Sequence, residues 1–415
     1  MSSAGRALRR PRTPATASGI IKPLLGVVIA AGILYVAVEA AGGRNLLDEG
    51  LRAVGGADIG TALTSIGLTM STVSGDLEIR EYCRSEHSSE LAWHFRNQTV
   101  DVPFYTACPG SGWLERFQEL APSAPLMVVD IGCNKGYSSA HVFSLWAPEL
   151  GFAPDTLRTK RPEVPCGTCA DCNEQVLVKS TVKKHSAPLT LFCVEPSMRN
   201  FAHLILTRDA FFPPTSPPDL QWYIVNAAVS NVTGVSHFPR GCVDELCSLQ
   251  GNSDGTRPRD FDYVPLTTLD ALVKDYAIPA IDILKIDTEG FDATVILGSM
   301  EVLARGRVSL LTFEYHEVGV WREYALRDVV EKLDGLDYVC YFDSKQTLSR
   351  MTSCWDPAYE YYNWSNVVCV KRTHFMYAEL EAMSSRFERH RAEYYAGKRA
   401  AGQGKEPTVQ DAASP

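Results

Sequence analysis

The sequence lacks an excess of basic residues. Its 415 residues include 40 lysines and arginines against 49 aspartates and glutamates, which gives a formal net charge of −9 and a pI of about 5.6. Binding to the phosphate backbone of nucleic acids needs clustered positive charge, and no basic face stands out in the part of the chain expected to fold. The sequence also has no internal repeat, which excludes a repeat architecture. We therefore expect a neutral or small partner and no nucleic acid.

The chain also lacks the glycine pattern of a dinucleotide-binding loop. The segment Asp130-Ile-Gly-Cys-Asn-Lys-Gly136 stands between an expected strand and an expected helix, where such a loop belongs. Counted from Gly132, the second and third glycine positions hold Asn134 and Tyr137. The missing glycines disfavour a pyrophosphate cradle. The turn therefore predicts a ligand that approaches the backbone closely but has no phosphate.

One long apolar run is present, near the N-terminus. The apolar run 23–38, counted with its flanking small residues as 19–43, supplies the roughly 20 residues that cross a bilayer, and basic residues without any acid precede Glu39. This charge distribution predicts a cytoplasmic tail (1–18), a transmembrane signal anchor (19–43) and a single-pass type II protein facing the lumen of the Golgi or endoplasmic reticulum. A signal peptide cleaved after Ala40, giving a secreted protein, and an organellar transit peptide are the alternatives.

Cysteine and sequon content agrees with a lumenal location. Twelve cysteines predict disulfides in an oxidising compartment, and Asn97, Asn231 and Asn363 begin glycosylation sequons. Cys340, Cys354 and Cys369 are expected to supply one bridge, whereas Cys133 and Cys193 fall in core elements and are expected to be free thiols. For Cys166, Cys169 and Cys172, disulfides are favoured over a zinc site completed by His185.

Alternating apolar segments predict an α/β fold with a mostly parallel sheet and helices on both faces. Strands are expected at 126–131, 189–194, 222–225, 281–286, 308–313, 338–342 and 367–370, the last two as an antiparallel pair. Helices are expected at 138–146, 198–207, 327–333 and 374–396. The predicted domains are a stem (44–75), a cap (76–120), a catalytic domain (121–373) with a cysteine-containing insert (153–188), and a C-terminal helix with a disordered tail (374–415).

Polar residues follow several of these strands, at the edge of the sheet where ligands bind. Glu195 follows the second strand, where a carboxylate can accept hydrogen bonds from a ribose diol. Asn226 and Ala227 follow the third, and small residues there leave room for a flat ring. With the glycine turn, these features describe an adenosine site without a phosphate cradle. S-adenosylmethionine fits this description.

Five motifs resemble the FkbM-type methyltransferase family, in order and over residues 121–320. They are Asp130-x-Gly-x-Asn-x-Gly136, Phe192-x-x-Glu-Pro196, Asn226-Ala-Ala-Val-Ser230, Thr267-Thr-Leu-Asp270 and Ile286-Asp-x-Glu-Gly290. The resemblance implies a class I, Rossmann-like fold and S-adenosylmethionine-dependent O-methylation of a glycan, sugar or other hydroxyl. It implies cofactor contacts from Asp130, Gly132, Asn134, Gly136, Glu195, Asn226 and Ala227, with Asp287 and Glu289 facing the acceptor. Cys133 departs from the small residue usual in the family.

Methyl transfer to a hydroxyl requires alignment of the acceptor and removal of one proton. Asp287, Glu289 and His316 are the candidate bases. Asp287 has the alternative role of capping the next helix, and His316 that of a hydrogen-bonded structural histidine. We assign no metal ligand, although a divalent cation held by these oxygens is an alternative route. A lipid or small-molecule methyltransferase of an organelle and a catalytically silent glycan-binding domain are the competing functions.

Overall fold

The computed structural model describes residues 110, 112–164, 182–240, 248–249, 261–344 and 347–400. All of them belong to one compact unit that spans residues 78–415. The predicted tail, anchor, stem and most of the cap lie outside the described residues, as do the end of the C-terminal tail and Cys166, Cys169 and Cys172.

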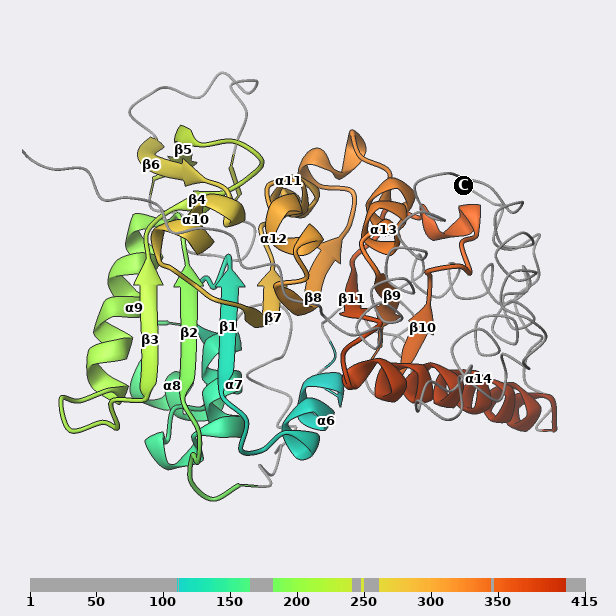
Figure 1. Ribbon diagram of the computed structural model, residues 1–415, viewed down its shortest axis with the longest axis horizontal. Helices are drawn as coiled ribbons and strands as arrows, with labels where there is room; N and C mark the ends of the chain where they lie inside the picture. The colour runs from blue at the N-terminus through green and yellow to red at the C-terminus, as the bar shows by residue number, and fades with distance from the viewer. Residues whose placement is uncertain are drawn as a thin grey trace, which may run out of the picture. The chain divides into compact units, whose positions relative to one another are not determined.

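The main sheet has the strand order β10-β9-β11-β8-β7-β1-β2-β3 (Figure 1). The strands β3, β2, β1, β7 and β8 pair in parallel, and β11 pairs antiparallel to both β8 and β9. Their bounds are β1 (Leu126–Ile131), β2 (Leu189–Val194), β3 (Leu220–Val225), β7 (Ile281–Ile286), β8 (Val308–Tyr315), β9 (Tyr338–Asp343), β10 (Leu348–Arg350) and β11 (Ser365–Lys371). The predicted parallel sheet with a final antiparallel pair is confirmed.

Helices cover both faces of this sheet, as predicted. Neighbouring residues of β1 point to opposite faces of the sheet and belong to two different hydrophobic cores. The core that contains Val128 includes residues of α6 (Gly112–Leu120), α7 (Tyr137–Trp146), α8 (Pro154–Lys160), α9 (Met198–Phe211) and α14 (Met376–Ala400). Val129 packs with α10 (Leu269–Asp275), α11 (Asp292–Leu297), α12 (Met300–Ala304) and α13 (Leu326–Gly335). Burial on both faces explains why the central strands are almost continuous apolar runs rather than alternating ones.

A second, three-stranded sheet was not predicted. It consists of β4 (Ala228–Val229), β5 (Gly234–Pro239) and β6 (Phe261–Thr267) in the order β4-β6-β5, and it lies beyond the carboxyl ends of β2 and β3 (Figure 1). β4 has only two residues, and β6 contains Pro265, a residue type that is disfavoured inside strands. Its strands therefore gave weak signals in the sequence.

Two disulfides join described residues. Cys340–Cys369 links β9 to β11, which confirms the predicted bridge among the C-terminal cysteines. Cys133–Cys193 links the loop after β1 to β2, so the prediction that these two are free thiols is wrong. The two cysteines are 60 residues apart in the sequence, but parallel pairing of β1 with β2 places them on adjacent segments with Cα atoms 5.5 Å apart.

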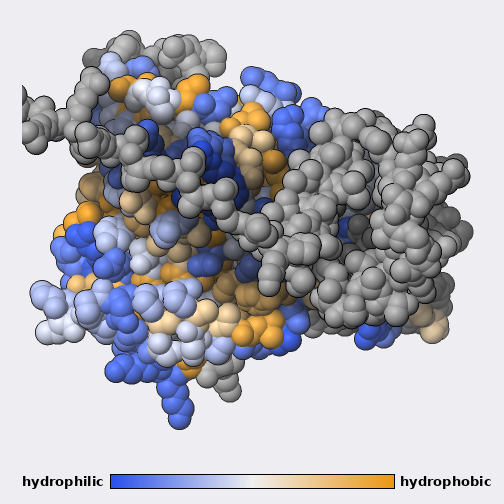
Figure 2. Space-filling model, in the orientation of Figure 1, coloured by the Kyte–Doolittle hydropathy of each residue, from blue (hydrophilic) through white to orange (hydrophobic). Residues whose placement is uncertain are grey.

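No helix within the described residues is long and apolar enough to cross a membrane. The long helix α14 is largely polar. On the described part of the face in Figure 2, hydrophilic and hydrophobic residues are interspersed, and large exposed apolar side chains such as Tyr223, Val235 and Tyr263 belong to the edge strand and the small sheet.

The strand order reverses between β1 and β7, although the two strands run parallel. From β1 the chain steps outward through β2 and β3, and it then returns to add β7 on the other side of β1. In open α/β sheets, ligands bind at the carboxyl ends of the strands at such a switch point. The segments that follow β1, β2, β7 and β8 are therefore the expected walls of a site.

Candidate active site

The loop after β1 packs closely against the end of β7. Gly132 has φ +78°, and a Cβ built there would lie 1.7 Å from the backbone oxygen of Asp287. Asn134 also has a positive φ (48°), and Gly136 (φ 85°) precedes the first residue of α7. Only glycine meets both demands at position 132. The loop after β1, which is expected to contact the cofactor, therefore packs against the turn after β7, which is expected to face the acceptor.

Asp130 lies at the base of this loop and is almost fully buried. Its Oδ2 accepts hydrogen bonds from the hydroxyls of Ser138 (2.6 Å) and Ser139 (3.0 Å). Its Oδ1 lies 3.5 Å from Nζ of Lys285, which also pairs with Asp287 at 2.8 Å. Burial lowers the pKa of Lys285, but the nearby carboxylates outweigh it and raise the pKa above its ordinary value. Asp130 therefore fixes the start of α7 and, through Lys285, the end of β7.

Glu195 follows β2 and is held by two backbone amides. The amide of Asn134 donates to Oε2 at 2.9 Å, and the amide of Ser197 donates to Oε1 at 2.8 Å. The residue is 4% exposed, and burial raises its pKa to about 8 despite these donors. The Asn200 side chain also contacts the carboxylate as a donor. A carboxylate has about four acceptor positions, so it can still accept hydrogen bonds from a diol.

Asn226 and Ala227 follow β3, next to Glu195. The Asn226 side-chain amide donates to the backbone oxygens of Glu195 (2.8 Å) and Pro196 (3.1 Å), which fixes the turn that carries the carboxylate. Ala227 is buried. The structure thus brings the predicted cofactor residues of β1, β2 and β3 to one edge of the sheet and gives Asn226 a positioning contact.

Asp287 and Glu289 occupy the connection between β7 and α11. Asp287 makes the ion pair with Lys285, and no side chain caps α11, so the alternative role of Asp287 as a helix cap is wrong. The carboxylate that organises this connection belongs to Asp292, which accepts from the amides of Gly290 (3.3 Å) and Glu314 (3.2 Å). Asp292 is fully buried, and burial together with the Asp287 charge raises its pKa to about 7.

The backbone around Glu289 has an unusual conformation. Glu289 has φ 52°, and Gly290, with φ +95°, lies so close to the segment after β8 that a Cβ would stand 2.4 Å from the Val318 backbone oxygen. The Val320 amide donates to the Gly290 oxygen at 2.8 Å. A non-glycine residue at positive φ persists only where its surroundings hold it. These contacts hold the connection after β7 against the segment after β8.

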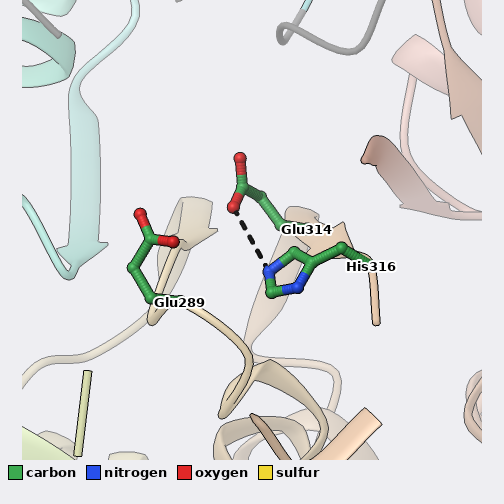
Figure 3. Close-up of side chains that lie close together, drawn as sticks. All are labelled: Glu289, Glu314 and His316. Carbon is green, nitrogen blue, oxygen red and sulfur yellow. Dashed lines mark ion pairs between the residues drawn. The ribbon is translucent and has the colours of Figure 1, made fainter. Parts of the chain in front are cut away.

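Glu289, Glu314 and His316 form a side-chain cluster at this contact. One ligand-type atom of each lies within 4.8 Å of the others, and Figure 3 shows the His316 imidazole turned toward the Glu314 carboxylate, with Glu289 on the neighbouring segment. His316 Nε2 is 3.8 Å from Glu314 Oε2. His316 is fully buried and stacks on Trp364 with ring centroids 4.5 Å apart. Burial lowers its pKa to about 4, so the ring is neutral at physiological pH.

The spacing of this cluster is that of a metal site, but the imidazole does not fit one. His316 Nδ1 accepts a hydrogen bond from the Val318 amide at 3.1 Å, which places the proton of the neutral ring on Nε2, the nitrogen that faces the carboxylates. A metal-binding histidine instead donates its second N–H to an acceptor and offers its other nitrogen without a proton. The alternative of a divalent cation is therefore not supported by His316.

His185, proposed as a fourth zinc ligand, has other partners. Its Nδ1 contacts Glu149, and its Nε2 lies 3.3 Å from Asp219. Both ring nitrogens of His185 thus face carboxylates, so neither is placed to bind zinc.

Three residues of the site were not predicted as site residues, namely Lys285, Asp292 and Glu314. Lys285 is one of two charged residues, with Asp282, that interrupt the apolar residues of β7, and a charge in a buried strand is itself a signal of a partner. Glu314 stands two residues before His316, so both side chains point to the same face at the end of β8.

A family model described as "Methyltransferase FkbM domain" matches residues 130–340, about half of the chain. Among solved structures, the chain is similar to a methyltransferase FkbM from Methylobacillus flagellatus KT, with 13% sequence identity and a TM-score of 0.32. The match covers 59% of this chain and 43% of that chain, so less than half of that protein's length is represented. Comparison with curated proteins gives no match.

Proposed function

The chain belongs to the FkbM methyltransferase family, and we propose that it is an S-adenosylmethionine-dependent O-methyltransferase acting on a glycan or sugar hydroxyl. The observation that carries the proposal is the pairing of Glu195 with the loop after β1. The Asn134 amide of that loop and the Ser197 amide hold the buried carboxylate at the switch point of the sheet. A carboxylate beside a glycine turn suits the ribose of an adenosine ligand.

The residues after β1, β2 and β3 would hold the cofactor. Glu195 would accept the ribose hydroxyls, Gly132 and Gly136 would allow the ligand to approach the backbone, and Ala227 would line the adenine side. When bound, S-adenosylmethionine supplies an activated methyl group on a positively charged sulfur.

The residues after β7 and β8 would handle the acceptor. Asp287, Glu289 and His316 stand on this side. Asp287 is neutralised by Lys285 at 2.8 Å, and His316 carries its proton toward the site, so neither is suited to take a proton. Orientation of the acceptor oxygen is the larger part of the catalysis, because aligned reactants can contribute roughly 7–11 kcal/mol to the lowering of a barrier.

Incubation of the full chain with isotope-labelled S-adenosylmethionine and a glycan panel tests this function. We expect label in one class of glycan, with the mass increase of a methyl group. Label only in lipids or small metabolites would favour the organellar alternative. Absence of calorimetric heat with both S-adenosylmethionine and S-adenosylhomocysteine would favour a silent glycan-binding domain and refute the enzyme proposal.

The proposal includes a location in the lumen of the secretory pathway, through the anchor at residues 19–43. Asn231 supports it, because this sequon lies exposed between β4 and β5, where a glycan can be attached. Treatment of the expressed protein with an endoglycosidase should increase its gel mobility, and Asn231→Gln should remove part of that change. A protein from secretory cells that is insensitive to the enzyme would contradict the lumenal location.

A further inference from the structure

Glu314 has a buried side-chain oxygen without a hydrogen-bond donor, as Asp130 has at Oδ1. It is the penultimate residue of β8 and is 8% exposed, and its Oε2 is buried without a hydrogen-bond donor. A buried oxygen without a hydrogen-bond partner lowers the stability of the fold, so its presence in the site calls for a functional explanation. Its backbone is fixed on both sides, because its amide donates to Asp292 and the residue pairs in register with Asn366 of β11. The backbone of Glu314 is thus held in place, and its Oε2 can accept a hydrogen bond.

The charges around Glu314 favour its neutral form. The groups that face it are carboxylates with one cation among them, namely Asp287, Glu289, Asp292 and Lys285, together with the neutral His316. Burial, and then the charges of the acids, raise its pKa well above the ordinary range. A carboxylate with a raised pKa is, in its ionised form, more basic than an ordinary one. Glu314 is therefore a stronger proton acceptor than an exposed glutamate.

His316 is placed to aim this carboxylate. Its ring is fixed by stacking on Trp364 and by the Val318 amide at Nδ1, so the Nε2–H direction is set by the fold. The remaining distance of 3.8 Å to Glu314 Oε2 is longer than a hydrogen bond, as is common for catalytic pairs before the substrate is bound. A donor aimed at one oxygen leaves the other oxygen for the acceptor hydroxyl.

We propose that Glu314 is the proton acceptor for the substrate hydroxyl and that His316 is its positioning residue, acting as an Nε2–H donor. The inference rests on the proposed methyltransferase function. In the transfer, the acceptor oxygen forms a bond to the methyl carbon, and the carbon–sulfur bond breaks with its electron pair passing to sulfur. The hydroxyl proton passes to the Glu314 carboxylate, and S-adenosylhomocysteine is the co-product.

The first test is independent of the acceptor. Nitrogen-15 NMR of the histidine-labelled full chain should show His316 as a neutral ring protonated at Nε2, with the signal assigned by its loss in His316→Gln. An Nδ1–H ring, or a charged ring at neutral pH, would overturn the positioning role.

The second test uses methyl transfer from labelled S-adenosylmethionine to a mixture of hexose methyl glycosides. Glu314→Gln should bind S-adenosylhomocysteine within about twofold of the parent protein but lose at least about 100-fold in transfer rate, the usual range for a general base. Glu314→Asp should recover part of the rate. His316→Phe should shift the rising limb of the rate–pH profile to higher pH, because removal of a donor destabilises the charged carboxylate, and His316→Gln should return it part of the way.

The outcomes separate the two proposals. Glu301→Gln, an exposed acid on α12 paired with Arg305, serves as a control that should keep the parent rate. Failure of the parent protein to bind S-adenosylhomocysteine refutes the proposed function. Normal binding with an undiminished rate in Glu314→Gln refutes this inference alone. If the parent transfers nothing to the glycosides, a carboxyl infrared titration decides. Glu195 and Asp292 also titrate above the ordinary range, so Glu314→Gln should remove one component of these bands. An infrared titration identical to that of the parent would refute the inference.

Discussion

Cofactor affinity should depend on pH through Glu195. The carboxylate must be ionised to accept hydrogen bonds from both ribose hydroxyls, whereas burial raises its pKa to about 8 in the free protein. Binding must then be accompanied by proton release below this pH, and the apparent affinity must rise with pH up to it. A group with pKa about 8 weakens binding about 100-fold at about pH 6 and about twofold at about pH 8. The expected gain is therefore roughly 50-fold, or about 2 kcal/mol.

The ligand for this measurement should be 5′-methylthioadenosine. It keeps the ribose and the adenine but has no α-amino group, which titrates near pH 8 in the full cofactor and would give a competing slope. Titration calorimetry in two buffers of different ionisation enthalpy measures the affinity and the released proton together. Glu195→Gln should bind more weakly at about pH 8 and show no slope. An affinity in the parent that is flat over this range, or a slope that survives in Glu195→Gln, would refute the role of Glu195.

Three further predictions concern the framework of the site. Gly132→Ala should prevent normal folding or abolish cofactor binding, because its Cβ would overlap the Asp287 backbone. The control is Gly151→Ala, at a similar positive φ (61°) but with no atom within 4 Å of the added Cβ. It should lower the free energy of unfolding in urea by only about 1 kcal/mol. Equal effects of the two would contradict this. Lys285→Met should destabilise the fold by about 3 kcal/mol because Asp130 loses its cation, while Arg305→Met, in an exposed pair, should change the unfolding free energy by less than about 0.5 kcal/mol. A raised pKa in Asp292, from 3.8 to about 7, means that its stabilising contribution is complete below the unfolded pKa and is lost as the pH rises through about 7. Asp292→Asn should flatten that decline in urea unfolding measured at about pH 5 and about pH 8, and a decline equal to that of the parent would exclude Asp292 as its source.

Most of the central sheet could be predicted from the sequence, because its strands are buried on both faces. Segments such as 126–131, 189–194 and 281–286 are apolar runs with few interruptions, and the structure has strands with these bounds. The small sheet could not be predicted in the same way. β5 and β6 are partly exposed, and β6 contains a proline, so their pairing depends on contacts between distant segments.

For the site, the sequence identified which strand ends matter but not how the carboxylates divide their tasks. Asp287 and Glu289 stand out beside a glycine, yet the ion pair of Asp287 with Lys285 depends on the side-chain geometry. Glu314 lies beside His316 in the sequence, and its significance depends on the burial of Oε2 and on the tautomer of the imidazole. The pKa of each carboxylate depends on its burial and on nearby charges in the folded protein, and the spacing of residues in the sequence does not reveal these.

The Cys133–Cys193 bond has a consequence for how the protein is produced. It ties the residue before Asn134 to a residue two positions before Glu195, so it duplicates covalently the hydrogen bond between the loop and the carboxylate. Protein made in a reducing bacterial cytoplasm and protein made in a secretory host would share every residue but differ in this cross-link. Two laboratories could then measure different cofactor affinities for one sequence, and the redox history of each preparation would account for the difference.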